Sequence, residues 1–305
     1  MNFQQKLDNI IKKNNSLVCV GLDSDVTKIS SGKKQYPVSN PTEQYLSLFL
    51  FNKDIIEATH DLVCSYKLNT AFYESIGHEG INALKDTCDY LKKYYPEIPI
   101  IIDAKRGDIG NTNEGYVQFI FTYLGADAVT IHPYLGEEAI RPFLMQKDKG
   151  IIILCRTSNP GAGEFQDLVI SNEVRDPVTE GNVNKKKNAS LDFSATPRNN
   201  KNGLKLYQYV AYQVTKNWNK NKNCLLVVGA TYPKELKEIR EIVGDNMTFL
   251  VPGIGAQGGN LEATLRAGLN KKKSGLIIHS ARAIIFGSNP RAEAKKLKDS
   301  INVYR

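Results

Sequence analysis

Short apolar runs alternate with amphipathic stretches along most of this 305-residue chain. The runs are rich in Val, Ile, Leu and Phe, as strands buried on both faces of a sheet usually are. Between them, apolar residues recur at helical spacing, most clearly over residues 204–218 and 233–243. The pattern predicts strands over residues 17–23, 62–69, 98–103, 128–133, 151–157, 224–231, 248–253 and 276–280.

Eight strands that alternate with helices predict an α/β fold, either a closed (β/α)8 TIM barrel or an open doubly wound sheet. Polar side chains at the strand ends favour the barrel, because a barrel brings all of these ends to the one face where such enzymes place their chemistry, whereas an open sheet would spread them along an edge. These side chains are Asp23, Lys67, Asn69, Asp103, Lys105, Thr157 and Arg282.

The chain is longer than the roughly 250 residues of a typical barrel, and the sequence indicates where the additional residues lie. Phe3, Leu7 and Ile10 repeat at helical spacing and predict an extra N-terminal helix laid against the body. Residues 167–202 are rich in Asn, Lys, Ser and Thr and predict a partly mobile insertion after the fifth strand. Residues 24–44 predict a second long loop. No domain linker is visible, so we expect a single domain over residues 1–305.

Composition and charge limit the classes of protein to which this chain can belong. The 41% hydrophobic and 24% charged residues are ordinary for a globular chain. The net charge of +8 comes from scattered lysines without zinc-knuckle spacing or aromatic-basic interleaving, so we expect no nucleic-acid partner but a field that attracts small anions. Neither an apolar run of about 18 residues nor a signal-peptide core occurs, and we expect no membrane partner.

Cysteine and histidine usage points to a cytosolic protein. The five cysteines form no CxxC pair and fall mostly in predicted strands, so we expect reduced thiols and a cytoplasmic location. The four histidines, His60, His78, His132 and His279, have no metal-ligand spacing, and we assign each a structural or surface role.

The run Asp103-Ala104-Lys105-Arg106-Gly107-Asp108 is the strongest chemical signal. Side chains alternate along a strand, so Asp103 and Lys105 share a side. Lys67 and Asn69 form a similar pair on the preceding strand, about 4.8 Å away. We expect one polar cluster in which Asp103 stays ionised and both lysines stay protonated. A salt-bridge network that merely closes the barrel is the alternative, but it would cost much desolvation for little stability.

Two further segments indicate ligand contacts. Glycines over residues 252–259, after the seventh strand, let the backbone approach an anion, and Arg282 after the eighth strand adds a bidentate contact. Barrel enzymes commonly bind phosphate there. Residues 156–161, Arg-Thr-Ser-Asn-Pro-Gly, offer hydroxyls and an amide that can recognise the polar edge of a heterocycle, although an ordinary Asn-Pro turn would explain them as well.

Residues 103–112 resemble the signature of the orotidine 5′-monophosphate decarboxylase family. Asp23, Lys67, the 156–161 and 252–259 segments and Arg282 occur in the order that this family shows. The resemblance covers nearly the whole chain. The long insertion and the richness in Asn and Lys are similar to divergent protozoan members, including those of malaria parasites.

The resemblance implies a cytoplasmic, homodimeric TIM barrel that decarboxylates orotidine 5′-monophosphate to uridine 5′-monophosphate (UMP), the last step of UMP biosynthesis, without a metal or an organic cofactor. Lys105 would protonate C6 of the pyrimidine, Asp103 would lie beside the departing carboxylate, and Lys67 would bridge the ribose and the acidic cluster. The partner subunit's Asp108 would complete the charged array. The implied substrate contacts are Asp23 and Asn69 for the ribose or for nearby members of the cluster, Thr157 and Ser158 for the base, Pro252, Gln257 and Arg282 for the phosphate, and Ile109 and Thr112 across the dimer.

Two rival functions remain open. A magnesium-dependent sugar-phosphate lyase of the same superfamily shares Asp-x-Lys-x-x-Asp, although Lys67 beside the acids disfavours a divalent cation. A catalytically silent barrel that only binds a nucleotide is the second. Orotate phosphoribosyltransferase, the preceding enzyme of the pathway, is an expected associate by family analogy.

Overall fold

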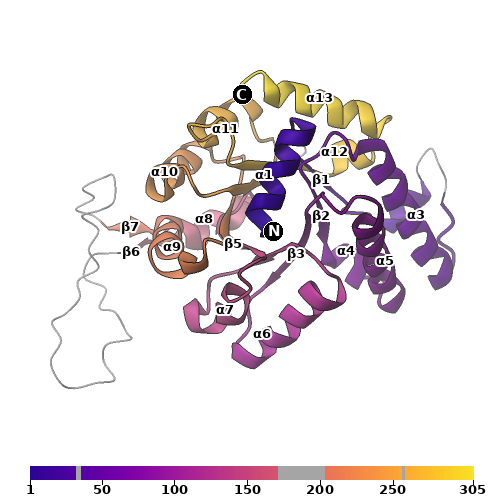
Figure 1. Ribbon diagram of the computed structural model, residues 1–305, viewed down its shortest axis with the longest axis horizontal. Coiled ribbons are helices and arrows are strands. Elements are labelled where there is room, and N and C mark those ends of the chain that lie inside the picture. The colour runs from indigo at the N-terminus through magenta and orange to yellow at the C-terminus, as the bar shows by residue number, and fades with distance from the viewer. Residues whose placement is uncertain (32–35, 171–202, 256–257) are drawn as a thin grey trace.

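The computed structural model describes residues 1–31, 36–170, 203–255 and 258–305. Within these residues, eight parallel strands close into a barrel in the order β1-β10-β9-β8-β5-β4-β3-β2, which confirms the predicted TIM barrel (Figure 1). All eight predicted strands are present. They are β1 (Val18–Gly21), β2 (Ser65–Asn69), β3 (Ile100–Arg106), β4 (Ala128–Ile131), β5 (Gly150–Arg156), β8 (Cys224–Val228), β9 (Phe249–Val251) and β10 (Leu276–Ser280).

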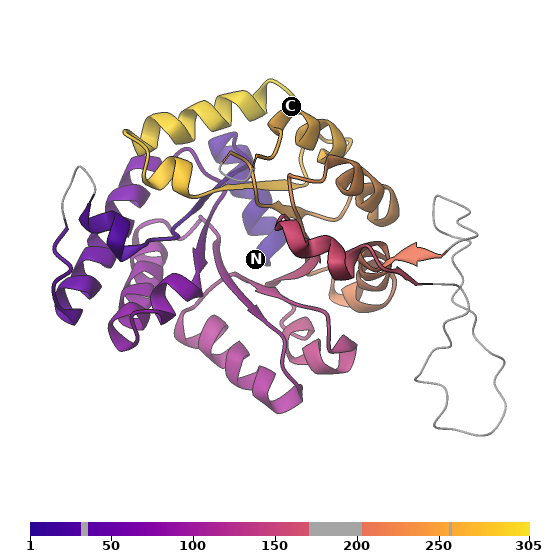
Figure 2. The ribbon, with the colours of Figure 1, turned by 180° about the vertical axis from the view of Figure 1, so that it is seen from behind.

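Helices surround the barrel on all sides (Figures 1 and 2). They cover the outward faces of strands that are apolar on both sides. No helix among the described residues is long and apolar enough to cross a membrane. The α-helices are α1 (Phe3–Asn14), α2 (Val26–Ser30), α3 (Pro41–Thr59), α4 (Thr70–Glu74), α5 (His78–Tyr94), α6 (Gly110–Val117), α7 (Gly136–Leu144), α8 (Gly163–Gln166), α9 (Leu206–Gln213), α10 (Pro233–Val243), α11 (Leu261–Gly268), α12 (Arg282–Ile285) and α13 (Pro290–Asn302).

The predicted N-terminal helix, α1, lies across one end of the barrel (Figure 1). Asn2 and Gln5 form a capping box that starts it. Lys6 pairs with Asp127, just before β4, at 2.8 Å, and the Gln4 side chain accepts a hydrogen bond from Thr248, just before β9. The helix therefore covers the amino ends of the strands and leaves the carboxyl ends open.

Two predicted loops contain more structure than the sequence indicated. Residues 24–44 include α2, which Asp25 caps, and the first turn of α3. In the insertion, β6 (Val169–Ile170) pairs antiparallel with β7 (Leu204–Lys205), so the two ends of the insertion form a short ribbon. The helix predicted over 204–218 therefore begins only at Leu206. These two-residue strands are too short to leave a periodic signal. Residues 171–202, the rest of the predicted insertion, lie outside the described residues.

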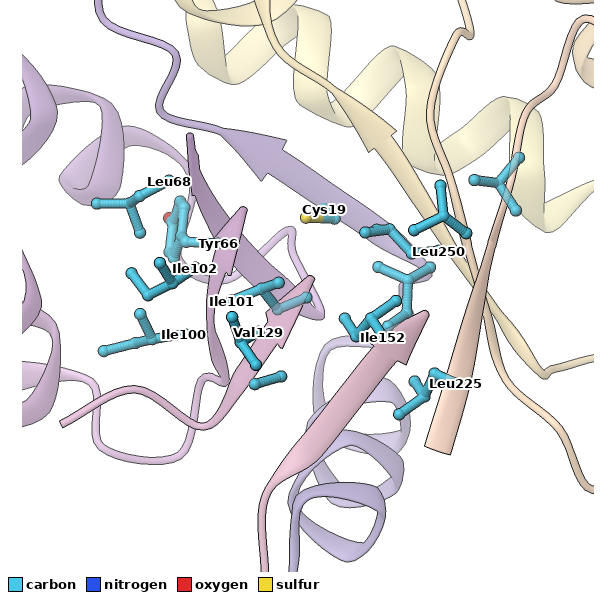
Figure 3. Packing of buried hydrophobic residues seen from close by; sticks show 14 of the residues in the cluster. Cys19, Tyr66, Leu68, Ile100, Ile101, Ile102, Val129, Ile152, Leu225 and Leu250 are labelled. Carbon is cyan, nitrogen blue, oxygen red and sulfur yellow. The ribbon is translucent and has the colours of Figure 1, made fainter. Parts of the chain in front are cut away.

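The barrel interior is packed with side chains (Figure 3). Cys19, Ile152 and Leu250 meet inside the barrel, whereas Tyr66 and Ile100 lie on the outer side of their strands. All five side chains are buried. Because a filled interior is the rule for this architecture, a ligand can enter only at a barrel end.

Candidate active site

A cavity of about 480 Å³ opens at the carboxyl ends of the strands. Most of the predicted site residues meet in its wall, although they come from segments spread over some 260 positions of the chain. Apolar side chains of β5, β8 and β9 form the opposite part of the wall, namely Leu154, Val227 and Leu250. The predicted residues that line the cavity are Asp23, Lys67, Asn69, Asp103, Lys105, Thr157, Ser158, Pro252 and Arg282.

Four charged side chains form a continuous array along β3, β2 and the end of β1. Lys105 Nζ lies 2.6 Å from one carboxylate oxygen of Asp103, and Lys67 Nζ lies 2.8 Å from the other. Lys67 Nζ also lies 3.3 Å from Asp23 Oδ1. The i, i+2 spacing on β3 and the pairing of β2 with β3 thus bring together Lys67, Asp103 and Lys105, three of the four members of the predicted cluster. Asn69, at the end of β2, accepts a hydrogen bond from the first turn of α4.

Both buried members of this array are held in their charged forms. Burial by itself would raise the pKa of Asp103, but the ammonium groups of Lys67 and Lys105 outweigh it and lower that pKa far below its usual range. Burial would likewise lower the pKa of Lys67, yet attraction by Asp103 and Asp23 raises it above its usual value. Asp103 and Lys67 are therefore charged across the physiological pH range.

The backbone at Lys105 is unusual and is held by a residue that sequence reasoning missed. Lys105 has φ of 48°, a left-handed conformation that is rare outside glycine, and the β3–β4 register shifts beside it. Thr130 on β4 accepts a hydrogen bond from the Lys105 backbone N–H at 3.0 Å and donates one to Asp103 at 2.7 Å. Its sequence signal was weak, a single hydroxyl in the apolar strand 128–131.

The two loops that the sequence predicts to bind phosphate follow β9 and β10 and lie across the cavity from β3. Pro252 and Gly253 follow β9, and Gly253 has φ of 102°, which requires glycine. Arg282, at the start of α12, is exposed and makes no ion pair with another described residue, so its guanidinium is available to an anion. Gln257, the other predicted phosphate contact, lies outside the described residues.

The segment after β5 is fixed by a buried arginine. The Arg156 guanidinium lies 3.9 Å from the ring centre of Tyr232 and contacts Gln166 at 3.2 Å and Asp167 at 3.1 Å. Gln166 in turn accepts from the Thr157 N–H at 2.9 Å and donates to its hydroxyl at 2.8 Å. Gln166 also lines the cavity. No sequence motif indicated this contact, because Gln166 lies nine positions after Thr157.

Known protein families show which family the chain belongs to. The model of the Orotidine 5′-phosphate decarboxylase / HUMPS family matches residues 16–297. The chain belongs to this family. A relative named orotidine 5′-phosphate decarboxylase from Cellvibrio japonicus is 43% identical over 100% of both chains. A relative of the same name from a Janthinobacterium species is 38% identical and covers 100% of this chain and 99% of its own.

Solved structures of the orotidine 5′-phosphate decarboxylase family have the same fold. A Leishmania donovani OMP decarboxylase superposes with a TM-score of 0.76 at 32% identity and covers 100% of this chain and 98% of its own. A putative orotidine-monophosphate-decarboxylase from Plasmodium yoelii gives a TM-score of 0.80 at 26% identity, with 99% of both chains covered. The chain thus shares more identical residues with the two bacterial relatives than with this malaria-parasite protein.

Three residues of the decarboxylase signature do not reach the cavity of their own chain. Asp108, Ile109 and Thr112 lie beyond β3 and in the first turn of α6, where all three are exposed, and Ile109 is 58% exposed. The Asp108 carboxylate accepts a hydrogen bond from the Ile109 N–H at 2.7 Å. The chain therefore presents these three side chains outward.

The arrangement suits the stabilisation of negative charge at a carbon atom. Lys105 lines the cavity, and its ammonium group is paired with Asp103 at 2.6 Å. Among the described residues, no group of three or more His, Cys, Asp or Glu side chains could hold a metal ion. His279, for which we expected a structural or surface role, is buried and also lines the cavity.

Proposed function

We propose that this protein decarboxylates orotidine 5′-monophosphate to UMP and CO2, with Lys105 as the proton donor to C6. The charged array at the barrel mouth of a decarboxylase-family chain carries this proposal. Loss of CO2 leaves an electron pair on C6 that the ring delocalises poorly. An ammonium group beside C6 stabilises that charge as it forms and then delivers the proton.

The other members of the array keep Lys105 in place. Asp103 binds Lys105 and Lys67 through different carboxylate oxygens, so it fixes both before substrate arrives. Charges that are oriented in advance need no reorganisation during the reaction, which is why they lower the barrier effectively. Asp103 lies beside the departing carboxylate, and Lys67 links the array to the ribose.

The wall of the cavity suggests how the nucleotide lies. The phosphate binds at Arg282 and Pro252, the ribose near Asp23 and Asn69, and the base against the segment with Thr157 and Ser158. Gln257, which lies outside the described residues, is a further proposed phosphate contact. Phosphate binding far from C6 supplies energy that can be spent on the chemical step.

We further propose a homodimer of single-domain subunits, each a barrel spanning residues 1–305. The outward position of Asp108, Ile109 and Thr112 supports it, because these signature residues can act only on a neighbouring site. Mixing Lys105→Ala with Asp108→Ala protein tests the dimer. After random exchange about half of the dimers contain one subunit of each kind, and each of these has one intact site and one doubly defective site. About a quarter of wild-type activity should therefore return. No recovery after subunit exchange would argue against shared sites.

A cytoplasmic location and an association with orotate phosphoribosyltransferase complete the proposal. All five cysteines are buried and none forms a disulfide, as expected for a reducing compartment. A Leishmania donovani UMP synthase gives a TM-score of 0.78 at 34% identity, and the match covers 100% of this chain but 56% of that longer chain. Co-purification of the native protein with transferase activity tests the association.

One ultraviolet assay tests the reaction against its rivals. We expect the absorbance of orotidine 5′-monophosphate to fall at the same rate with and without a strong chelator. Loss of turnover on chelation would favour a magnesium-dependent lyase. Tight UMP binding without any loss of orotidine 5′-monophosphate would favour a silent nucleotide-binding barrel.

A further inference from the structure

His279 differs from every other polar residue of the cavity wall. It lies at the end of β10, is 8% exposed and lines the cavity. Its Nε2 faces Gly21, is closed off from solvent and has no hydrogen-bond partner among the described residues. An unpaired buried polar group of this kind costs about 1–3 kcal/mol. A residue kept at such a cost inside a ligand cavity is a candidate for a ligand contact.

The fold makes room for this ring. Gly21, on the neighbouring strand β1, has no side chain, and a Cβ placed there would lie 2.3 Å from His279 Nε2. The imidazole therefore occupies the space that a side chain on β1 would fill. Packing alone would be served better by an apolar side chain such as that of Ile277, two residues earlier on β10, because it would leave no unpaired nitrogen.

The ring is uncharged in the folded protein. Burial lowers the pKa of His279 to about 3, and Lys67 adds to this, while Asp23 and Asp103 oppose it. A neutral imidazole offers one N–H donor and one acceptor. It can therefore bind a hydroxyl without adding a cation that would compete with Lys105 for Asp103.

The strand order places His279 between the two ends of the expected ligand. Along the barrel mouth, β3 and β2 carry the Asp103 and Lys67 part of the array, β1 and β10 follow, and β9 leads into the phosphate loop. Arg282 comes three residues after His279. In a nucleotide, the pentose joins the base to the phosphate. A ligand that spans from Lys105 to Arg282 therefore has its pentose over the part of the wall formed by β1 and β10, where His279 lies.

We propose that His279 is a substrate-contacting residue that hydrogen-bonds to a pentose hydroxyl of the bound nucleotide. The proposal rests on the proposed function for the identity of the ligand. It extends the ribose contacts beyond Asp23 and Asn69 and assigns His279 a role in selecting ribonucleotides.

Binding of UMP, 2′-deoxy-UMP and 3′-deoxy-UMP to the wild type and to His279→Leu tests this contact. We expect the leucine variant to bind UMP about five- to tenfold more weakly, since one hydrogen bond is lost. Its preference for UMP over one of the two deoxynucleotides should disappear, because that hydroxyl has lost its partner. His279→Asn, which keeps a donor and an acceptor, should recover part of the affinity. The control is His60→Leu, because His60 stacks on Tyr95 outside the cavity.

Nitrogen-15 spectra of the histidine rings give a second readout that needs no turnover and no variant. Addition of UMP should shift the His279 resonances and leave those of exposed His78 in place. Unshifted His279 resonances with UMP bound, or unchanged discrimination by His279→Leu, would overturn the proposal. A wild type that binds UMP with these shifts but does not decarboxylate would refute the proposed function and leave the contact standing.

Discussion

The two parts of the cavity wall are built from the same kind of strand yet have opposite chemistry. The wall on β1–β3 carries Asp23, Lys67, Asp103 and Lys105, joined by contacts of 2.6–3.3 Å. The wall on β5, β8 and β9 carries apolar side chains, Leu154, Val227 and Leu250 among them. The first wall holds paired charges, and the second presents apolar surface to the same cavity. Charges act much more strongly next to such a wall than in water.

The difference between the two walls also indicates which of them contributes more to the free energy of unfolding. Lys67 is 3% exposed, and two buried ions gain little net stability even when they are paired. The apolar wall belongs to the continuous hydrophobic core, whose burial stabilises the fold. Changes in the charged wall should therefore reduce catalysis or alter pH dependence, whereas changes in the apolar wall should mainly reduce stability.

The largest effect is expected from Lys105→Ala. Without the ammonium group, nothing stabilises or protonates the developing charge on C6, so kcat should fall roughly 10³-fold or more. The protein should still fold, since the Lys105 side chain is 49% exposed and Asp103 keeps Lys67 as a partner. The ultraviolet assay and thermal melting measure the two quantities. Lys6→Ala, at the other barrel end, is the control and should keep full activity. Near-normal turnover by Lys105→Ala would end the assignment.

Arg282→Ala extends the comparison to the phosphate end. Loss of a charge-assisted contact should weaken binding of UMP about 10- to 100-fold and leave the binding of uridine unchanged. Calorimetry with the nucleotide and the nucleoside measures both. Arg266→Ala removes the same charge from α11, outside the cavity, and should bind both ligands like the wild type. Equal losses for UMP and uridine with Arg282→Ala would argue against a phosphate role.

His279, beside the charged wall, should give the protein a specific pH dependence. Its pKa falls from the usual 6.5 to about 3 on folding, so between these values mainly the unfolded chain binds this proton. The free energy of unfolding should therefore decrease as pH falls below about 6.5, by up to about 1.4 kcal/mol per pH unit from this group.

Denaturant titrations of His279→Asn between pH 4.5 and 7 test that slope. The variant should show a flatter dependence than the wild type. Val227→Ala, in the apolar wall, should instead lower the free energy of unfolding by about 1–3 kcal/mol at every pH, because it removes buried methyl groups and no titrating group. Parallel curves for the wild type and His279→Asn would contradict a buried neutral ring.

The smallest effect is expected from Thr130→Val, which preserves shape and removes one hydroxyl. The Lys105 N–H and Asp103 each lose a hydrogen bond, so we expect kcat to fall about tenfold and stability by about 1 kcal/mol. Thr264→Val is the matched control, because Thr264 is also buried and hydrogen-bonded but lies on α11 outside the cavity. It should lose stability and keep kcat. Equal kcat values for the two variants would show that Thr130 does not position Lys105.

Much of this site could be predicted from the sequence, because the residues that indicate it lie close together along the chain. The pair Asp103 and Lys105 shares a strand, and alternation alone puts both on one side. Arg282 and the glycines after the seventh strand are placed by their strand ends. The helix predicted over residues 233–243 coincides with α10, since a proline in the first turn and a glycine after the last residue mark its ends.

Other parts depend on contacts that only the closed barrel creates. Thr130 meets Asp103 across 27 residues, and His279 reaches the cavity only because Gly21 lies on the adjacent strand. The β6–β7 ribbon needs partners that are more than 30 residues apart. The sequence alone determined the strands, their order along the chain and the charged motif, because each arises from neighbouring residues. The tertiary structure decided which side chains share the cavity and which face outward, because barrel closure sets distances between strands that no local pattern contains.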